Sequence, residues 1–297
     1  MLLAVAGDLV QDVVVLTGEP IRRGSDTAAQ VTTQRGGSAA NVAAFAEASG
    51  TPTRFVGCVG DDVAGAALTA ELAGHGVDLL VQRRGVTGVI VVVVDQDGER
   101  TMYPSRGASA LLEPVDAGWL VGVDVLHLPL YGFDGGSTPD ALGAAADAVR
   151  DSGGRVSVDL SSTLLLDRHG AGWVRDVLAR VRPTWVSANA DEVRALGLDT
   201  GAWLDDHPGV VVLARAGAAP TRVLRAGAEP RVVPVAPVDG VLDTTGAGDA
   251  FAAGFLGAVL GRADLVAAVE AGHALAARVV TAPGATLPPS PRPPSPS

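Results

Sequence analysis

The sequence predicts a three-layer α/β/α fold built on a mostly parallel sheet, with a small β-sheet lid added to it. Apolar runs typical of strands alternate with helical stretches along most of the 297 residues. Such alternation is typical of a parallel sheet that helices cover on both faces. Two stretches, 9–35 and 86–104, break the alternation with short apolar runs that no helix follows. These two stretches predict the lid.

The expected elements follow one another at regular intervals. Runs rich in valine and leucine predict strands at 2–7, 53–60, 123–130, 155–160, 184–189 and 209–214. Runs of helix-forming residues predict helices at 39–50, 63–76, 138–153, 248–261 and 263–281. Within the second lid stretch, Asp97-Gly98 is a dipeptide typical of a hairpin turn. We therefore expect one domain over 1–286, with a disordered Pro/Ser-rich tail at 287–297.

Composition excludes several classes of function. A net charge of −11 leaves no basic face for nucleic acid or an anionic membrane. The 22 basic residues are all arginine, which excludes a P-loop lysine and a Schiff base. The single cysteine, Cys58, cannot form an internal disulfide, so we expect a cytoplasmic protein. No apolar run approaches the roughly 20 residues of a membrane span.

The stretch "DTTGAGDAFAAGFLGAVL" at 243–260 combines a glycine turn with a helix start. Gly246, Ala247 and Gly248 would leave backbone N–H groups free at the positive end of the helix, where anions bind. Asp249, in the first turn, could accept a proton from an attacking hydroxyl. An ordinary loop with a helix cap is the alternative reading of the same residues.

A second glycine turn enters a helix in "QRGGSAANVAAFAEASG" at 34–50. Gly36 and Gly37 allow a ligand to approach the backbone, and the Asn41 amide can both donate and accept hydrogen bonds. Asp12, in "GDLVQD", follows the first strand, and the carboxyl ends of parallel strands are where such sheets bind ligands. Asp12 could therefore hold a pair of sugar hydroxyls.

In this order, these stretches resemble the ribokinase-like (PfkB) carbohydrate kinase family over residues 2–286. "GGSAANVAAFAEASG" is similar to the first signature of the family and "DTTGAGDAFAAGFLGAVL" to the second. The resemblance implies that Asp249 is the catalytic base and that the N–H groups of Gly246, Ala247 and Gly248 form an anion hole. It also implies sugar contacts for Asp12, Gly36, Gly37 and Asn41.

The resemblance assigns further residues to the nucleotide and to metals. "NADE" resembles the N-x-x-E motif, in which Asn189 and Glu192 organise Mg²⁺ and the ATP phosphates. Other positions similar to the family are Asp243 and Thr245 for a monovalent cation such as K⁺, and His273 near the adenine. The chain departs from T-x-G-x-x-G, with Val212 and Ala214 in place of the first two motif residues. Gly217 remains, and Arg215 could compensate by reaching phosphate.

The resemblance therefore implies an ATP-dependent kinase that phosphorylates a hydroxyl of a sugar or sugar-like substrate. Arg106, near Tyr103, could contact a substrate carboxylate, as in keto-deoxy-gluconate kinases. In relatives the lid often pairs two subunits, which implies a homodimer. Two alternatives stay open: a nucleoside kinase of the adenosine type, and a sugar-binding regulator with weak catalysis. Neither the acceptor nor the preferred phosphoryl donor follows from the sequence.

Overall fold

The computed structural model describes residues 1–288, and its centre is a nine-stranded sheet. The strand order is β13-β12-β11-β10-β9-β8-β1-β4-β5. The strands from β11 to β5 run parallel, as predicted, whereas β12 and β13 form an antiparallel edge. The strands are β1 (Leu2–Ala6), β4 (Thr53–Val59), β5 (Asp78–Arg83), β8 (Val123–Pro129), β9 (Arg155–Asp159), β10 (Trp185–Asn189), β11 (Val211–Ala216), β12 (Ala219–Leu224) and β13 (Arg231–Val233).

Helices cover both faces of this sheet, because its strands are apolar on both sides. In β1, Leu3 and Val5 pack into one buried cluster, while Ala4 and Ala6 pack into the other. The first cluster is completed by α1 (Ser38–Ala48), α2 (Val63–Gly74), α7 (Ala247–Leu260) and α8 (Leu265–Val279). The second is completed by α3 (Thr138–Asp151), α4 (Thr163–Val181), α5 (Ala190–Leu196) and α6 (Gly201–Asp206). The three predicted layers are confirmed.

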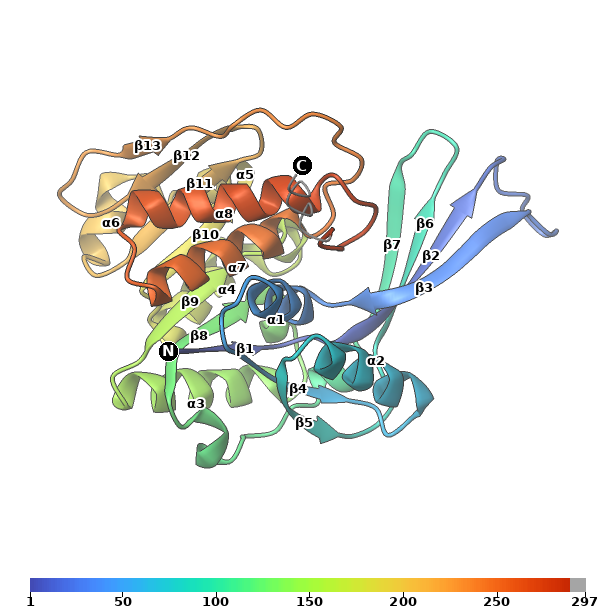
Figure 1. Ribbon diagram of the computed structural model, residues 1–297, viewed down its shortest axis with the longest axis horizontal. Coiled ribbons are helices and arrows are strands. Elements are labelled where there is room, and N and C mark those ends of the chain that lie inside the picture. The colour runs from blue at the N-terminus through green and yellow to red at the C-terminus, as the bar shows by residue number, and fades with distance from the viewer. Residues whose placement is uncertain (289–297) are drawn as a thin grey trace, which may run out of the picture.

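A separate four-stranded sheet, here called the small sheet, projects from the body (Figure 1). Its strand order is β3-β2-β6-β7, and the two predicted stretches supply all of it except the last residues of β3 and β7, Gly36 and Ser105. It connects to the body at the carboxyl edge of the large sheet, because β1 runs into β2 and β3 runs into α1. The strands are β2 (Val10–Thr17), β3 (Ala29–Gly36), β6 (Val89–Val94) and β7 (Arg100–Ser105).

Several elements were not predicted. The most prominent is α4, which a residue with non-helical φ and ψ interrupts at Gly170 (φ 84°, ψ 161°). The break divides the helix into two short pieces. Neither piece is long enough to show the regular spacing of apolar residues by which a helix is predicted from sequence. The others are the strands β5, β12 and β13, the helices α5 and α6, and the short 3₁₀ turns η1 (Gly107–Ala110), η2 (Ala117–Leu120) and η3 (Leu130–Phe133).

The chain stays packed past the predicted start of the tail at 287. Leu287 packs against the cluster that α1, α7 and α8 share, and the Pro288 carbonyl accepts a hydrogen bond from Arg278 at 3.0 Å. The rest of the predicted tail lies outside the described residues. Among residues 1–288, no helix is both long and apolar enough to cross a membrane.

Candidate active site

A cavity of about 660 Å³ opens at the carboxyl edge of the large sheet. Asp8 follows β1, Asp159 ends β9 and Asn189 ends β10, so three parallel strands deliver polar side chains to one place. The small sheet forms another wall of the cavity through Ile90, Met102 and Pro104. Of the residues predicted from sequence, those lining the cavity are Gly37, Arg106, Asn189, Glu192, Arg215, Gly246, Gly248 and Asp249.

Asp249 lies at the start of α7, and α1 holds its carboxylate in place. The Ser38 hydroxyl donates to Oδ1 at 2.6 Å, and the Asn41 amide donates to Oδ2 at 2.9 Å. Burial raises the pKa of Asp249 to about 6, against the opposing effect of these two hydrogen bonds. Asn41 was predicted to contact the sugar, but its amide points at the carboxylate. Ser38 was not predicted as a contributor to the site.

The glycine turn before Asp249 forms a cradle at the cavity wall. Gly246 has a left-handed backbone (φ 77°), which glycine adopts without strain. A Cβ on Gly248 would lie 2.9 Å from Nη1 of Arg215, so the absence of a side chain brings the guanidinium to the turn. Gly246 and Gly248 line the cavity, whereas the Ala247 N–H closes a turn onto the Thr244 carbonyl at 3.2 Å. The predicted anion hole therefore loses its middle donor.

An acid that the prediction missed, Asp159, faces Arg215. Nη2 of Arg215 donates to Asp159 Oδ2 at 2.8 Å, and the Ser161 N–H donates to Oδ1 at 2.8 Å. Asp159 directly ends a strand that was predicted. The rule that singled out Asp12, a polar residue at the carboxyl end of a parallel strand, could therefore have found it.

Asn189 and Glu192 form a capping box at the start of α5. The Asn189 side chain accepts from the backbone of Glu192 at 2.9 Å, and Glu192 Oε2 accepts the Asn189 N–H at 2.8 Å. The other oxygen, Oε1, is buried and has no hydrogen-bond partner among residues 1–288. Burial first, and then the charge of Asp159, raises the pKa of Glu192 to about 7.

The unpartnered Oε1 of Glu192 fits the predicted role next to a magnesium ion. Carboxylate oxygens are preferred Mg²⁺ ligands, and Mg²⁺ usually keeps several of its waters. Within residues 1–288, no group of three or more His, Cys, Asp or Glu side chains forms a ready metal cage. The residues thus fit an ion that few protein groups would contact directly and that Glu192 would hold through its waters.

At the other end of the cavity, Arg106 pairs with Asp8. Its Nη2 donates to Oδ1 at 2.6 Å and its Nε to Oδ2 at 3.3 Å. Nη1 donates to the Asp134 carbonyl at 2.7 Å, while the Asp134 carboxylate contacts Arg168 and His169 at 3.0 and 2.7 Å. This end of the cavity is therefore lined by paired charges, in which Asp8 contacts Arg106 and Asp134 contacts Arg168 and His169.

Asp12 and Gly36 do not line the cavity, contrary to prediction. Asp12 packs against the Cα of Gly36, where a Cβ would lie 2.1 Å from its Oδ1. That oxygen is buried and accepts no hydrogen bond from the described part of the chain, and burial raises the pKa of Asp12 to about 6. Because Asp12 lies on β2 and not in the preceding loop, Asp8 takes the place at the strand end.

His273 and Gly217 also lie outside the cavity. Nε2 of His273, on α8, is 2.8 Å from the Thr221 hydroxyl on β12, and its ring centroid lies 5.5 Å from that of Phe251. Burial lowers the pKa of His273. Gly217 has φ 61° in the turn between β11 and β12. The structure places both residues around the antiparallel edge of the large sheet.

Asp243 and Thr245, predicted to bind a monovalent cation, contact an arginine from the small sheet. Nη2 of Arg100 donates to Asp243 Oδ1 at 2.7 Å, and its Nη1 contacts the Thr245 hydroxyl. The Gly284 N–H donates to Oδ2 at 2.9 Å. Burial raises the pKa of Asp243, but these bonds and those from Thr245 outweigh it and lower the pKa to about 2. A guanidinium occupies these oxygens, so the residues do not fit K⁺.

Comparisons with known proteins agree with this architecture. The family model described as "pfkB family carbohydrate kinase" matches residues 2–292. An ATP-dependent ribose-1-phosphate kinase of Halopiger xanaduensis is 31% identical over 275 residues, covering 90% of this chain and 88% of its own length. A fructokinase of Klebsiella pneumoniae is 33% identical over 266 residues, covering 81% of this chain and 82% of its own length.

Solved structures share the whole fold. The adenosine kinase from Sinorhizobium meliloti superposes with a TM-score of 0.83 at 25% identity, covering 97% of this chain and 95% of that one. The family match spans nearly the full sequence and includes both glycine turns that meet at Asp249. The chain belongs to the pfkB family of carbohydrate kinases.

Proposed function

We propose that this chain transfers the γ-phosphoryl group of ATP to a hydroxyl of a sugar or sugar-like acceptor, with Asp249 as the general base. One observation carries the proposal. Asp249 lines the cavity at the start of a helix, between a glycine turn and a pair of hydrogen bonds that fix its carboxylate. A base needs such a fixed position within reach of the hydroxyl that it deprotonates.

The electrostatics of the site support this role. With a pKa of about 6, Asp249 is mainly ionised at neutral pH and can accept a proton. The donors at Ser38 and Asn41 hold the carboxylate in one orientation while the acceptor hydroxyl approaches. Protonation below pH 6 would remove the base, so the rate is expected to fall on the acidic side of that pH.

Phosphoryl transfer needs positive charge and N–H donors where negative charge develops. Gly246 and Gly248 expose backbone at the cavity wall, and the Arg215 guanidinium lies next to Gly248. We assign these groups to the transferring phosphoryl. Glu192 and Asn189 are assigned to Mg²⁺, which when bound neutralises charge on the phosphates.

The lining favours a sugar acceptor over a nucleoside. Tyr131 is the single aromatic side chain among the described residues that line the cavity, so there is no pair of rings to sandwich a base. The polar groups of Asp8, Arg106 and Asp134 suit the hydroxyls of a sugar. The small sheet closes the acceptor end and limits access of water, which would compete as an acceptor.

The outer face of the small sheet supports a homodimer. Because strand side chains alternate, Val31 and Tyr103 point to the face opposite Met102, which lines the cavity. Val31 and Tyr103 are 57% and 60% exposed, beside half-buried Val91. We propose that a second copy of the chain covers this face.

We also propose that the protein resides in the cytoplasm, where the single cysteine, Cys58, stays reduced.

Substitution Asp249→Asn should strongly reduce acceptor-dependent ATP consumption. We expect turnover to fall by roughly 10²–10⁴-fold with little change in acceptor binding, because the amide cannot accept the proton. The measurement is ATP turnover against ribose, ribose 1-phosphate, fructose, fructose phosphate, keto-deoxy-gluconate, adenosine, cytidine and pseudouridine.

Asp140→Asn is the matched control, because Asp140 lies in the first turn of α3, is exposed and should be neutral. Near-normal turnover in Asp249→Asn would remove that residue from the role of base. Turnover on a nucleoside alone would identify a nucleoside kinase. Silence on every compound, with thermal stabilisation by a sugar, would identify a sugar-binding regulator.

Arg100 should make the activity independent of K⁺. Because its guanidinium neutralises Asp243, the wild-type rate should be equal in K⁺ and Na⁺ buffers. Arg100→Ala should lower kcat/KM by about tenfold, the size of a partly exposed charged hydrogen bond, and K⁺ should restore part of it. Arg22→Ala, an exposed arginine of the same small sheet region, is the control. Dependence on K⁺ in the wild type, unchanged in Arg100→Ala, would contradict this prediction.

The double substitution Val31→Glu, Tyr103→Glu should dissociate the dimer, because it places charge in an apolar interface. Sedimentation velocity over a range of concentrations should show a dimer for the wild type and a monomer for the variant. Val232→Glu on β13, where the side chain is 60% exposed, should leave the dimer intact. A wild-type protein that sediments as a monomer throughout would refute the proposed interface.

A further inference from the structure

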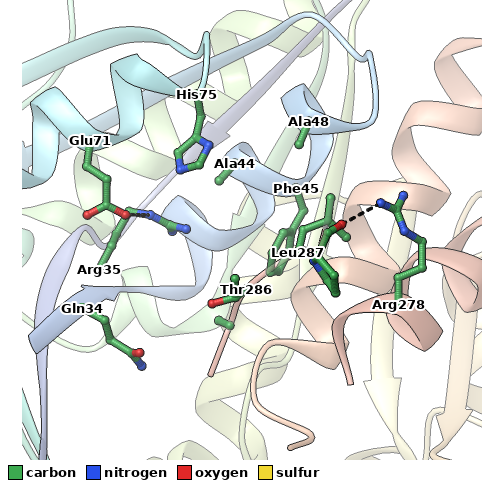
Figure 2. Close-up of a pocket in the computed structure, with 12 residues that line it drawn as sticks. Gln34, Arg35, Ala44, Phe45, Ala48, Glu71, His75, Arg278, Thr286 and Leu287 are labelled. Atoms are coloured by element: carbon green, nitrogen blue, oxygen red, sulfur yellow. Dashed lines mark hydrogen bonds and ion pairs between the residues drawn. The ribbon is translucent and has the colours of Figure 1, made fainter. Parts of the chain in front are cut away.

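A second cavity, of about 280 Å³, is lined by a different set of the described residues from those that line the first (Figure 2). Arg35, the penultimate residue of β3, lines it, together with Glu71 and His75 from the region of α2. Figure 2 shows the Arg35 guanidinium directed at Glu71, with the two joined by an ion pair. The same guanidinium faces the catalytic region on its other side.

Arg35 contacts Asn41, which contacts Asp249. Nη1 of Arg35 donates to Asn41 Oδ1 at 2.7 Å, and Asn41 Nδ2 donates to Asp249 Oδ2 at 2.9 Å. A guanidinium has only donors, so it can bind only the oxygen of the amide. Arg35 therefore determines which end of Asn41 faces the carboxylate, and the donor end is the one that stabilises an ionised base.

Burial makes this arginine unusual. Its side chain is 7% exposed, whereas that of Glu71, its ion-pair partner at 3.4 Å, is 48% exposed. A charge removed from water is costly unless other groups compensate it. Burial lowers the pKa of Arg35, while the charges of Glu71 and Asp249 oppose that shift. The cation is thus held between a surface carboxylate and the carboxylate in the cavity.

We propose that Arg35 is a positioning residue for the transfer reaction: through Asn41 it orients the Asp249 carboxylate and favours its ionised form. This inference rests on the proposed function, in which Asp249 is the base. Arg35 itself lines the second cavity and not the one that would hold the substrates. Its effect is therefore on the state of Asp249 and not on binding.

Other charged groups also face this pair and remain in place in the test. Asp159 and Arg215 act on Asp249 in opposite directions, and Tyr131 on η3 lies within its field. Asp12 on β2 acts on Arg35 together with Glu71. None of these groups changes when Arg35 or Glu71 is substituted. A shift in the titration of Asp249 in those variants therefore reports the connection from Arg35 through Asn41 to Asp249.

The test is the pH dependence of kcat/KM with the acceptor that turns over best in the panel. The acidic limb is the part of this profile where kcat/KM falls toward low pH as the base is protonated. In Arg35→Gln the acidic limb should move to higher pH by about one unit, since a fixed positive charge near the base is lost. The rate at pH 6 should fall by about fivefold and that at pH 8 should hardly change, because the base is already ionised there, with acceptor KM nearly unchanged. Arg35→Lys, which keeps the positive charge, should bring the acidic limb most of the way back to its wild-type position.

Glu71→Gln should move the limb in the opposite direction. Without the Glu71 carboxylate, the positive charge of Arg35 is no longer partly compensated and favours the ionised form of Asp249 more strongly. The acidic limb should therefore shift to lower pH by about 0.3 unit. Glu71 is half exposed, so this variant is expected to fold even if Arg35→Gln does not. Glu270→Gln, an exposed acid on α8, is the control and should leave the limb in place.

An unshifted limb in Arg35→Gln would overturn the inference. If that variant does not fold, an unshifted limb in Glu71→Gln overturns it instead. If no acceptor in the panel turns over, titration of the Asp249 carboxyl by NMR in the same variants reports the same shifts. Activity retained in Asp249→Asn would overturn the proposed function itself, whereas loss of activity there with no shift in the Arg35 and Glu71 variants would overturn only the inference.

Discussion

The hydrogen bonds that Ser38 and Asn41 donate to Asp249 are the contact on which the site depends. They join residues that are 211 and 208 positions apart in the chain, at the starts of α1 and α7. For these helix starts to meet, the large sheet must bring its N-terminal and C-terminal halves to the same edge. The fold thus places one carboxylate, fixed by two donors, in a cavity that the small sheet covers on one side.

Pairing of acids with arginines organises the charges around this carboxylate. Asp8 pairs with Arg106, Asp159 with Arg215, and Asp243 with Arg100. The chain contains no lysine, and the planar guanidinium can contact two oxygens at once. Among residues 1–288, Asp249 accepts its side-chain hydrogen bonds from the neutral groups of Ser38 and Asn41 instead, and burial raises its pKa. Burial also raises the pKa of Asp8 despite its contact with Arg106, so it is the neutral donors, and not the raised pKa, that distinguish the proposed base from the paired acids.

Much of the fold and part of the site could be predicted from sequence. The alternation of strands and helices, the small sheet and the glycine turn before Asp249 follow local rules of periodicity and turn chemistry. Asp12 and Ala247 show the limits of those rules. Motif spacing places both residues near a ligand, but the exact strand start puts Asp12 behind Gly36, and a local turn uses the Ala247 N–H.

The remaining residues depend on tertiary contacts that leave little trace in a single sequence. Arg100 reaches Asp243 across 143 positions, and Arg35 acts through the side chain of another residue. In isolation each is an ordinary strand arginine. The position of the small sheet relative to the body brings Arg100 to the loop that precedes α7, and Arg35 to the side chain of Asn41 on α1.

The most direct measurement compares two titrations of the wild-type protein. The first follows the Asp249 carboxyl by carbon NMR, assigned through Asp249→Asn, and the second follows the acidic limb of kcat/KM. If Asp249 is a buried base, both midpoints should coincide near the raised pKa of about 6. A carboxyl that titrates at the ordinary aspartate value near 4, with the activity limb at another pH, would contradict the account.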